Sequence, residues 1–151
     1  MIDILIGIDP GKSGGMTVCI DNQPKNLVAY PLEDITTLLE ALEEYKEFSR
    51  RIVAEECPPF VAGKNIPSSA GFKLGFSCGQ IEGVALGMRV PLYKLKPKEW
   101  QAGLSGLKGK TGAARKKVLK AHATRLYPHL SPTLKTADAI LLTHHFINNP
   151  N

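Results

Sequence analysis

The chain has 151 residues, of which 43% are hydrophobic and 22% are charged. That length suits one compact domain with its own core, so we expect a single domain over residues 1–151. No apolar run reaches the roughly 18 residues that a membrane span needs, and the first residues lack the basic flank of a signal peptide. We therefore expect a cytoplasmic protein without a membrane partner.

The apolar pattern predicts strands and helices along the whole chain. Short apolar runs bounded by turn residues predict strands at 2–9, 16–20, 26–30, 51–57 and 91–95. Helical spacing, caps and prolines predict helices at 33–48, 69–89, 97–104, 113–127 and 134–147. Strands followed by alternating helices and strands indicate an α/β sandwich.

Acidic residues stand at the ends of three of these apolar segments. Asp9 ends the first strand, Glu55 and Glu56 end the fourth, and Asp138 opens the last helix. Carboxylates that converge in a cleft repel one another unless a divalent cation neutralises them. The pattern therefore predicts a site for Mg²⁺, or Mn²⁺ in its place, that hydrolyses phosphodiesters. The alternatives are that Asp9 only forms a turn and that Asp138 only interacts with a helix dipole.

Basic residues are concentrated in the second half of the chain, although the net charge is only +5. Such a stretch is either a solvated face or a surface that binds the phosphate backbone of a nucleic acid, and its glycines and Trp100 favour the second interpretation. The residues are Lys94, Lys96, Lys98, Lys108, Lys110, Arg115, Lys116, Lys117 and Lys120.

Two further features concern packing. Cys19, Cys57 and Cys78 are spaced too widely for a zinc ribbon or a redox pair, so we interpret them as thiols in the core.

Five glycines follow one another at intervals of four from Gly71 to Gly87. Because each costs helix stability, we expect a close backbone contact, made either with the chain's own sheet or across a homodimer.

The order and spacing of four motifs resemble the RuvC family of Holliday junction resolvases, in the RNase H-like superfamily. The motifs are Ile6-Gly-Ile-Asp9-Pro-Gly, Val53-Ala-Glu55-Glu56, Lys96-Pro-Lys-Glu-Trp100-Gln and Ala137-Asp138-Ala139. Together they span nearly the whole chain. The short length and the Lys-Pro-Lys-Glu-Trp segment are most similar to the phage and organellar branches of the family.

This resemblance implies an α/β fold with a five-stranded mixed sheet in the order 3-2-1-4-5, flanked by helices. It implies a metal-dependent endonuclease that acts as a homodimer on four-way DNA junctions and leaves 5′-phosphate ends. Such a protein works in the cytoplasm of a bacterial or phage-infected cell, or in an organelle.

The resemblance also suggests roles for individual residues. Asp9, Glu55 and Asp138 would hold the metal, with Glu56 as the alternative to Glu55, since consecutive strand residues point to opposite faces. Many relatives carry another acid three or four residues before the last aspartate, where this chain has Lys135 and Leu134. Lys135 would then either offset charge on the phosphate or be a solvated lysine at the start of the helix.

Residues outside the carboxylate cluster would hold the DNA. The resemblance suggests that Phe60 stacks on a base at the crossover, but its offset from Glu55 differs from the family pattern, and the alternative is that Phe60 fills the core. The resemblance also suggests that the basic residues from Lys94 to Lys117 hold the arms of the junction. Two other functions are compatible with the sequence: a related nuclease acting on other branched DNA or on RNA, and a junction-binding protein without catalytic activity.

Overall fold

A computed structural model describes residues 1–58 and 67–150 of the chain. Its strands are β1 (Asp3–Asp9), β2 (Gly15–Ile20), β3 (Leu27–Pro31), β4 (Ser49–Glu55) and β5 (Leu92–Leu95). Its helices are α1 (Ile35–Glu44), α2 (Ser68–Gly87), α3 (Pro97–Gln101), α4 (Gly112–Leu126) and α5 (Ala137–Asn148), with short 3₁₀ turns η1 (Pro24–Asn26) and η2 (Pro128–Leu130). None of the described helices is long and apolar enough to span a membrane.

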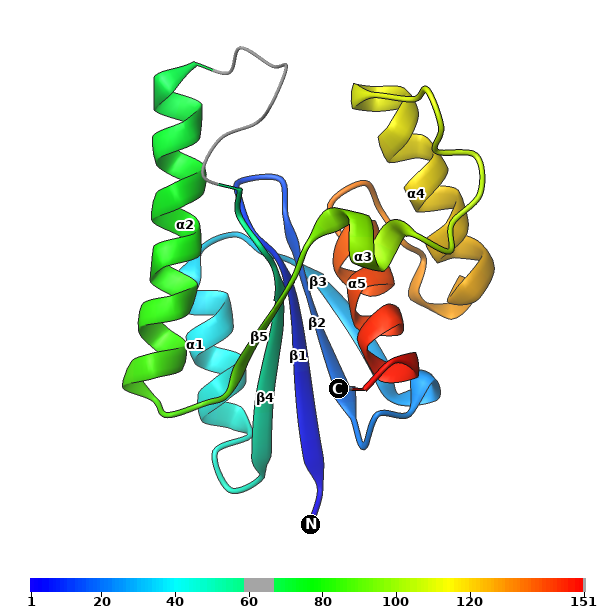
Figure 1. The fold of residues 1–151 in the computed structure, drawn as a ribbon. Helices are drawn as coiled ribbons and strands as arrows, with labels where there is room; N and C mark the ends of the chain where they lie inside the picture. Colours follow the sequence, from blue (N-terminus) through cyan, green and yellow to red (C-terminus); the bar gives the residue numbers. More distant parts are fainter. Residues whose placement is uncertain (59–66, 151) are drawn as a thin grey trace.

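The strands form one sheet in the order β3-β2-β1-β4-β5. β2 runs antiparallel to both of its neighbours, β3 and β1, whereas β1, β4 and β5 run parallel to one another. Because parallel strands end at the same edge, the last residues of β1 and β4 lie side by side there (Figure 1). The predicted mixed sheet and its order are confirmed.

Helices cover both faces of the sheet, α1 and α2 on one side and α3, α4 and α5 on the other (Figure 1). Successive side chains along the strands therefore point alternately to the two faces. Ile4, Ile6 and Ile8 face the core under α1 and α2, whereas Leu5 and Val53 face the core under α3, α4 and α5. Burial on both faces explains why the central strands read as continuous apolar runs.

The predicted start of the last helix was three residues too early, since α5 begins at Ala137. The residues before it form a turn in which Thr133 and Thr136 bond to each other. The backbone N–H of Thr133 donates to Oγ1 of Thr136 at 2.9 Å, and the N–H of Thr136 donates to Oγ1 of Thr133 at 3.2 Å. Hydroxyls that bond to nearby backbone groups favour turns over helix.

Two glycines let α5 approach the sheet closely. A side chain on Gly7 would overlap the hydroxyl of Thr143, which in this arrangement hydrogen-bonds Oγ1 of Thr17 at 2.6 Å. A side chain on Gly15 would overlap the carbonyl oxygen of Lys135 and Cα of Thr136. The residues just before α5 therefore lie directly against the start of β2.

The glycine stripe of α2 has the opposite environment. A Cβ built on Gly75, Gly79, Gly83 or Gly87 would meet no atom of the described residues within 4 Å. The interpretation in which these glycines pack against the chain's own sheet is therefore wrong. The same face carries the exposed side chains of Phe72, Phe76 and Leu86, which are 74%, 59% and 81% exposed.

We predict that Gly15→Ala destabilises the protein by about 1–3 kcal/mol, because the new methyl group meets backbone atoms that move only if α5 moves. Thermal unfolding followed by circular dichroism measures the effect. Gly103→Ala is the matched control, since its methyl group would have no neighbour within 4 Å. Equal melting temperatures for the two variants would contradict the close approach of α5.

Candidate active site

Strand alternation places Asp9 and Glu55 on the same face of the sheet. Asp9 lies four residues after Leu5 in β1, so the two side chains point to the same face. Glu55 lies two residues after Val53 in β4 and shares its face in the same way. Leu5 and Val53 both face the core under α5. Glu56 has the opposite parity and bonds through its backbone N–H to the carbonyl of Leu95 at 2.8 Å. The two carboxylates of Asp9 and Glu55 therefore both face α5.

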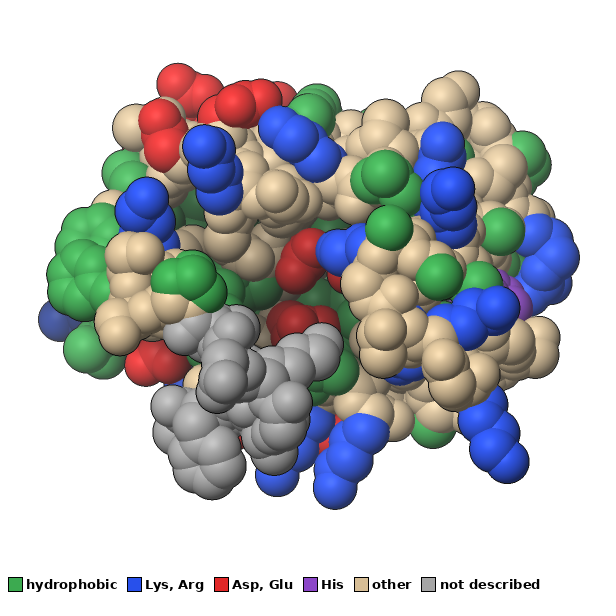
Figure 2. All heavy atoms as spheres, turned by 90° about the horizontal axis from the view of Figure 1, so that it is seen from above, with side chains coloured by type: hydrophobic (Ala, Val, Ile, Leu, Met, Phe, Trp, Pro, Cys, Tyr) green, Lys and Arg blue, Asp and Glu red, His purple; other side chains and the backbone are tan. Residues whose placement is uncertain are grey.

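Asp138 is brought to them by the start of α5. Gly15 pairs with Asp9 in the β1–β2 ladder, and the chain at Lys135 and Thr136 lies against Gly15. Asp138 follows in the first turn of α5, so its side chain lies next to the end of β1. Asp9 and Asp138 are both buried, at 8% and 7% exposure. Figure 2, which looks onto this edge of the sheet, shows acidic side chains inside a hollow.

The electrostatics show that the three carboxylates interact. Burial raises the pKa of Asp9 well above its ordinary value of 3.8, and the negative charges of Asp138 and Glu55 raise it further. Burial likewise raises the pKa of Glu55, and the charge of Asp138 adds to this effect. An ionised cluster of this kind is unfavourable without a cation.

Trp100 orients Glu55. The indole N–H donates to Oε2 of Glu55 at 2.9 Å, and this hydrogen bond opposes the rise in the pKa of Glu55. Trp100 is itself buried in α3, whose N-terminus is capped by the side chain of Glu99 on the backbone of Lys96. In the sequence Trp100 only favours a nucleic-acid interpretation of the basic stretch, and its contact with Glu55 leaves no local signal because the two residues are 45 positions apart.

The lysine at the cluster is Lys116 of α4. Its Nζ lies 2.7 Å from Oδ2 of Asp138, and its charge lowers the pKa values of Asp9 and Glu55. Lys135, the lysine that the sequence analysis assigned to the phosphate, has an exposed side chain in the turn before α5. No ion pair of Lys135 occurs among the described residues, so its catalytic role stays a prediction.

The cluster suits a hard divalent cation in its chemistry. Its donors are carboxylate oxygens, which Mg²⁺ prefers. Oδ1 of Asp138 is buried and has no hydrogen-bond partner in the described part of the chain, so it is free to bind an ion. Within those residues no three acidic, histidine or cysteine side chains already stand at ion-binding distances. Lys116 provides the positive charge at the cluster.

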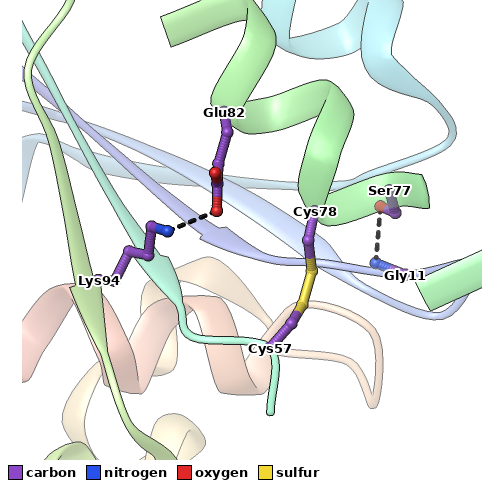
Figure 3. The surroundings of a disulfide bond; sticks show 6 residues. All are labelled: Gly11, Cys57, Ser77, Cys78, Glu82 and Lys94. Atoms are coloured by element: carbon purple, nitrogen blue, oxygen red, sulfur yellow. Dashed lines mark hydrogen bonds and ion pairs between the residues drawn. A yellow bond between two sulfur atoms is a disulfide. The ribbon is translucent and has the colours of Figure 1, made fainter. Parts of the chain in front are cut away.

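Glu56 follows β4 and points to the α2 side, where it lines a hollow together with Ala54, Cys57 and Cys78. Cys57 and Cys78 form a disulfide with their Cα atoms 6.6 Å apart, which Figure 3 shows between the end of β4 and α2. The prediction that these two cysteines are separate core thiols is therefore wrong, whereas Cys19 is a free buried thiol.

The disulfide fixes α2 next to the site. Close to Cys78 on α2, the hydroxyl of Ser77 accepts a hydrogen bond from the backbone N–H of Gly11, at 3.2 Å (Figure 3). Gly11 follows Asp9 by two residues, and Cys57 follows Glu55 by two. The bridge closes a loop with a sequence separation of 21 residues, and closing a loop of this size stabilises a fold by about 3 kcal/mol.

Part of the basic stretch lines one surface hollow of about 660 Å³, which we call the basic hollow. Arg115 is held there by the side-chain oxygen of Gln101 and by the carbonyl of Leu107. The charged residues that line it are Lys98, Lys108, Lys110 and Arg115. Lys and Arg side chains surround the acidic hollow in Figure 2.

The other predicted DNA contacts have different positions. Lys94 pairs with Glu82 at 2.5 Å on the side of α2, Lys96 and Lys117 are exposed, and Lys116 lies at the carboxylates. Phe60 lies outside the described residues. The DNA-binding roles of all these residues stay predictions.

The sequence matches no protein-family model and no curated protein. Solved structures do match. The chain superimposes on Thermus thermophilus RuvC in complex with a Holliday junction substrate with a TM-score of 0.57 and 19% identity, covering 98% of this chain and 96% of that one. A second structure of Thermus thermophilus RuvC gives a TM-score of 0.55 and 22% identity over the same shares of the two chains. The chain therefore has the fold of RuvC.

We predict that the metal-free protein loses stability as the pH rises from about 4 through the raised pKa values of Asp9 and Glu55. The folded state binds protons more tightly at these groups than the unfolded state, so stability is greatest at low pH for this contribution. Urea unfolding in EDTA at several pH values measures it. Asp9→Asn should flatten the loss and stabilise the protein at pH 7, by about 1.4 kcal/mol for each unit by which folding raises the pKa of Asp9. A variant that is less stable than the wild type at pH 7 in EDTA would contradict the repulsion.

Proposed function

We propose that the protein is a metal-dependent, structure-selective endonuclease that resolves four-way DNA junctions by paired symmetric nicks. The observation that carries this proposal is the meeting of Asp9, Glu55 and Asp138 at one edge of the sheet, on a fold shared with RuvC. One of the matched RuvC structures is a complex with a Holliday junction substrate. Four-way junctions are therefore the first substrate to test.

In this proposal Asp9, Glu55 and Asp138 would hold Mg²⁺, and the ion would supply the Lewis-acid chemistry that activates water and polarises the phosphate. The water oxygen forms a bond to phosphorus, and the bond from phosphorus to the 3′ oxygen breaks. The water loses a proton and the departing 3′ oxygen gains one, which leaves a 5′-phosphate and a 3′-hydroxyl. Trp100 keeps Glu55 oriented toward Asp138 through its indole hydrogen bond, and α5 sets the position of Asp138.

The basic hollow would hold a junction arm by its phosphates. Lys98 lies in α3, Lys108 and Lys110 lie in the segment before α4, and Arg115 lies in the first turn of α4, the helix that also carries Lys116 to the carboxylates. A phosphate backbone bound there would continue toward the acidic hollow. Because such contacts release counterions, junction affinity should fall steeply with salt.

We also propose that the protein acts as a homodimer that forms through the glycine-bearing face of α2. The glycine stripe of α2 has open space above it and is flanked by Phe72, Phe76 and Leu86. Exposed apolar side chains beside small residues are typical of a protein interface. A two-fold axis through this face would place one catalytic centre on each side, as paired nicks in a two-fold symmetric junction require.

We predict that the wild type nicks an end-labelled synthetic four-way junction at symmetric positions only with Mg²⁺ or Mn²⁺. Asp138→Asn should slow nicking by about 10³-fold or more, since it removes a metal ligand. Asp21→Asn is the control, because Asn keeps the oxygen that accepts the N–H of Asp3 at the far end of β1.

Other substrates separate the alternatives. Faster cutting of flaps, linear duplex or RNA than of junctions would make the protein a broader RNase H-like nuclease. Tight junction binding in EDTA, without nicks when metal is added, would make it a junction-binding protein.

We predict that Gly79→Glu converts a dimer to a monomer in analytical ultracentrifugation, with an equal or higher melting temperature. The glutamate places charge in the interface and is a better helix former than glycine, and nothing within 4 Å obstructs it. Gly103→Glu is the matched control on α3's side of the molecule. A wild type that is monomeric at micromolar concentration, or a Gly79→Glu protein that still dimerises, would contradict this interface.

A further inference from the structure

The two halves of α2 are attached to the rest of the fold in different ways. In the second half, Ile81 and Ala85 are buried in the core under α1 and α2. In the first half, from Ser68 to Gln80, the structure describes every residue and none is buried, while Phe72 and Phe76 are exposed to solvent. Hydrophobic burial therefore fixes the second half of α2, whereas the first half depends on other contacts.

These other contacts lie at the carboxyl edge of the sheet. The hydroxyl of Ser77 accepts a hydrogen bond from the backbone N–H of Gly11 at 3.2 Å, and the side chain of Leu74 lies close to the same turn. The covalent contact is the bridge between Cys78 on α2 and Cys57 after β4 (Figure 3). A crosslink that closes a loop stabilises a fold more than a single hydrogen bond does. The bridge is therefore the main attachment of the first half of α2.

The bridge is within reach of reagents in solution. Cys57 and Cys78 are both half-buried, and they line a hollow of about 90 Å³ together with Glu56 and Glu82. These acidic neighbours favour an uncharged reductant over an anionic one. Cys19 is a free thiol with no exposed surface. A small neutral dithiol therefore acts on the bridge, and alkylation of the folded protein reports on Cys57 and Cys78 alone.

We propose that the Cys57–Cys78 bridge is a redox switch, which holds the first half of α2 against the end of β4 when oxidised and releases it when reduced. The step is an exchange with a dithiol. One sulfur of the dithiol attacks the bridge, which forms a mixed disulfide with one cysteine and frees the other as a thiol. The second sulfur of the dithiol then displaces the remaining cysteine. The bridge gains two electrons and two protons, and the dithiol loses them and becomes a cyclic disulfide.

Reduction would affect the proposed dimer face and the proposed catalytic centre. Gly75, Gly79 and both exposed phenylalanines belong to the first half of α2, so this part of the face loses its fixed position, and ordering it again opposes association. At the other end of the bridge, Cys57 follows Glu55 by two residues. These effects on dimerisation and nicking rest on the functions proposed above, whereas the attachment of α2 does not.

The experiment compares the wild type after treatment with oxidised glutathione and after treatment with dithiothreitol. The double variant Cys57→Ser/Cys78→Ser is the matched control, because it lacks the bridge and should respond to neither reagent. Free thiols are counted by alkylation of the folded protein and mass spectrometry. Hydrogen exchange measures the opening of α2, and analytical ultracentrifugation measures dimerisation. Nicking of a four-way junction is measured with Mg²⁺ in both redox states.

We expect no alkylated thiol in the oxidised protein and two in the reduced protein. Reduction should speed hydrogen exchange at residues 68–80 by about tenfold or more and leave residues 81–87 nearly unchanged. It should lower the melting temperature by about 6–12 °C, and weaken dimerisation and slow nicking by about tenfold each. Oxidised glutathione should reverse these changes after the dithiol is removed. The double variant should behave like the reduced wild type in both reagents.

Three results would overturn the proposal. The first is a protein in which Cys57 and Cys78 are still alkylated after treatment with oxidised glutathione. The second is equal hydrogen exchange at residues 68–80 in the two redox states. The third is equal dimerisation and nicking in the two states in spite of a change in exchange, which would make the bridge a stabilising crosslink and not a switch. Failure of the nuclease function is distinct, because the wild type then cuts no substrate in either state, and exchange and dimerisation still decide the proposal.

Discussion

The contact of the start of α5 with the end of β1 and the start of β2 determines whether a site exists. Asp9 and Glu55 reach their positions through the parallel pairing of β1 with β4. Asp138 belongs to a helix that must be held against this edge. The close approach at Gly7 and Gly15 brings it there, and the buried hydroxyls of Thr17 and Thr143 bond across the same interface. The packing of small residues therefore determines the separation of the carboxylates.

That packing has an electrostatic cost. Bringing the carboxylates into a buried cluster raises the pKa values of Asp9 and Glu55. Trp100 and Lys116 offset part of this effect, one by a hydrogen bond to Glu55 and the other by an ion pair with Asp138. The Cys57–Cys78 bridge and the α3 cap keep the surrounding backbone in place. The site thus joins elements from the whole length of the chain at one edge of the sheet.

The sequence was informative where the signal is local and periodic. Continuous apolar runs and the acids that end them predicted the strands and three converging carboxylates. Strand parity explains in structural terms why Glu55, and not Glu56, faces Asp138. Contacts between distant segments were much harder to predict. Lys116 appeared as one of several lysines in a basic stretch, and its position depends on how α4 packs on α5.

Cys57 and Cys78 show the same limit, because their spacing matches no known motif and only the fold brings them together. The glycines of α2 show a different limit of prediction from the sequence. Their period indicated a close contact but not the surface that makes it, since a helix with a stripe of small residues looks the same whether it faces its own sheet or another chain. The structure rejects the first possibility by leaving open space above four of these glycines. An exposed helix gains nothing from glycine in its interior, and this cost is what the proposed contact with a second chain would explain.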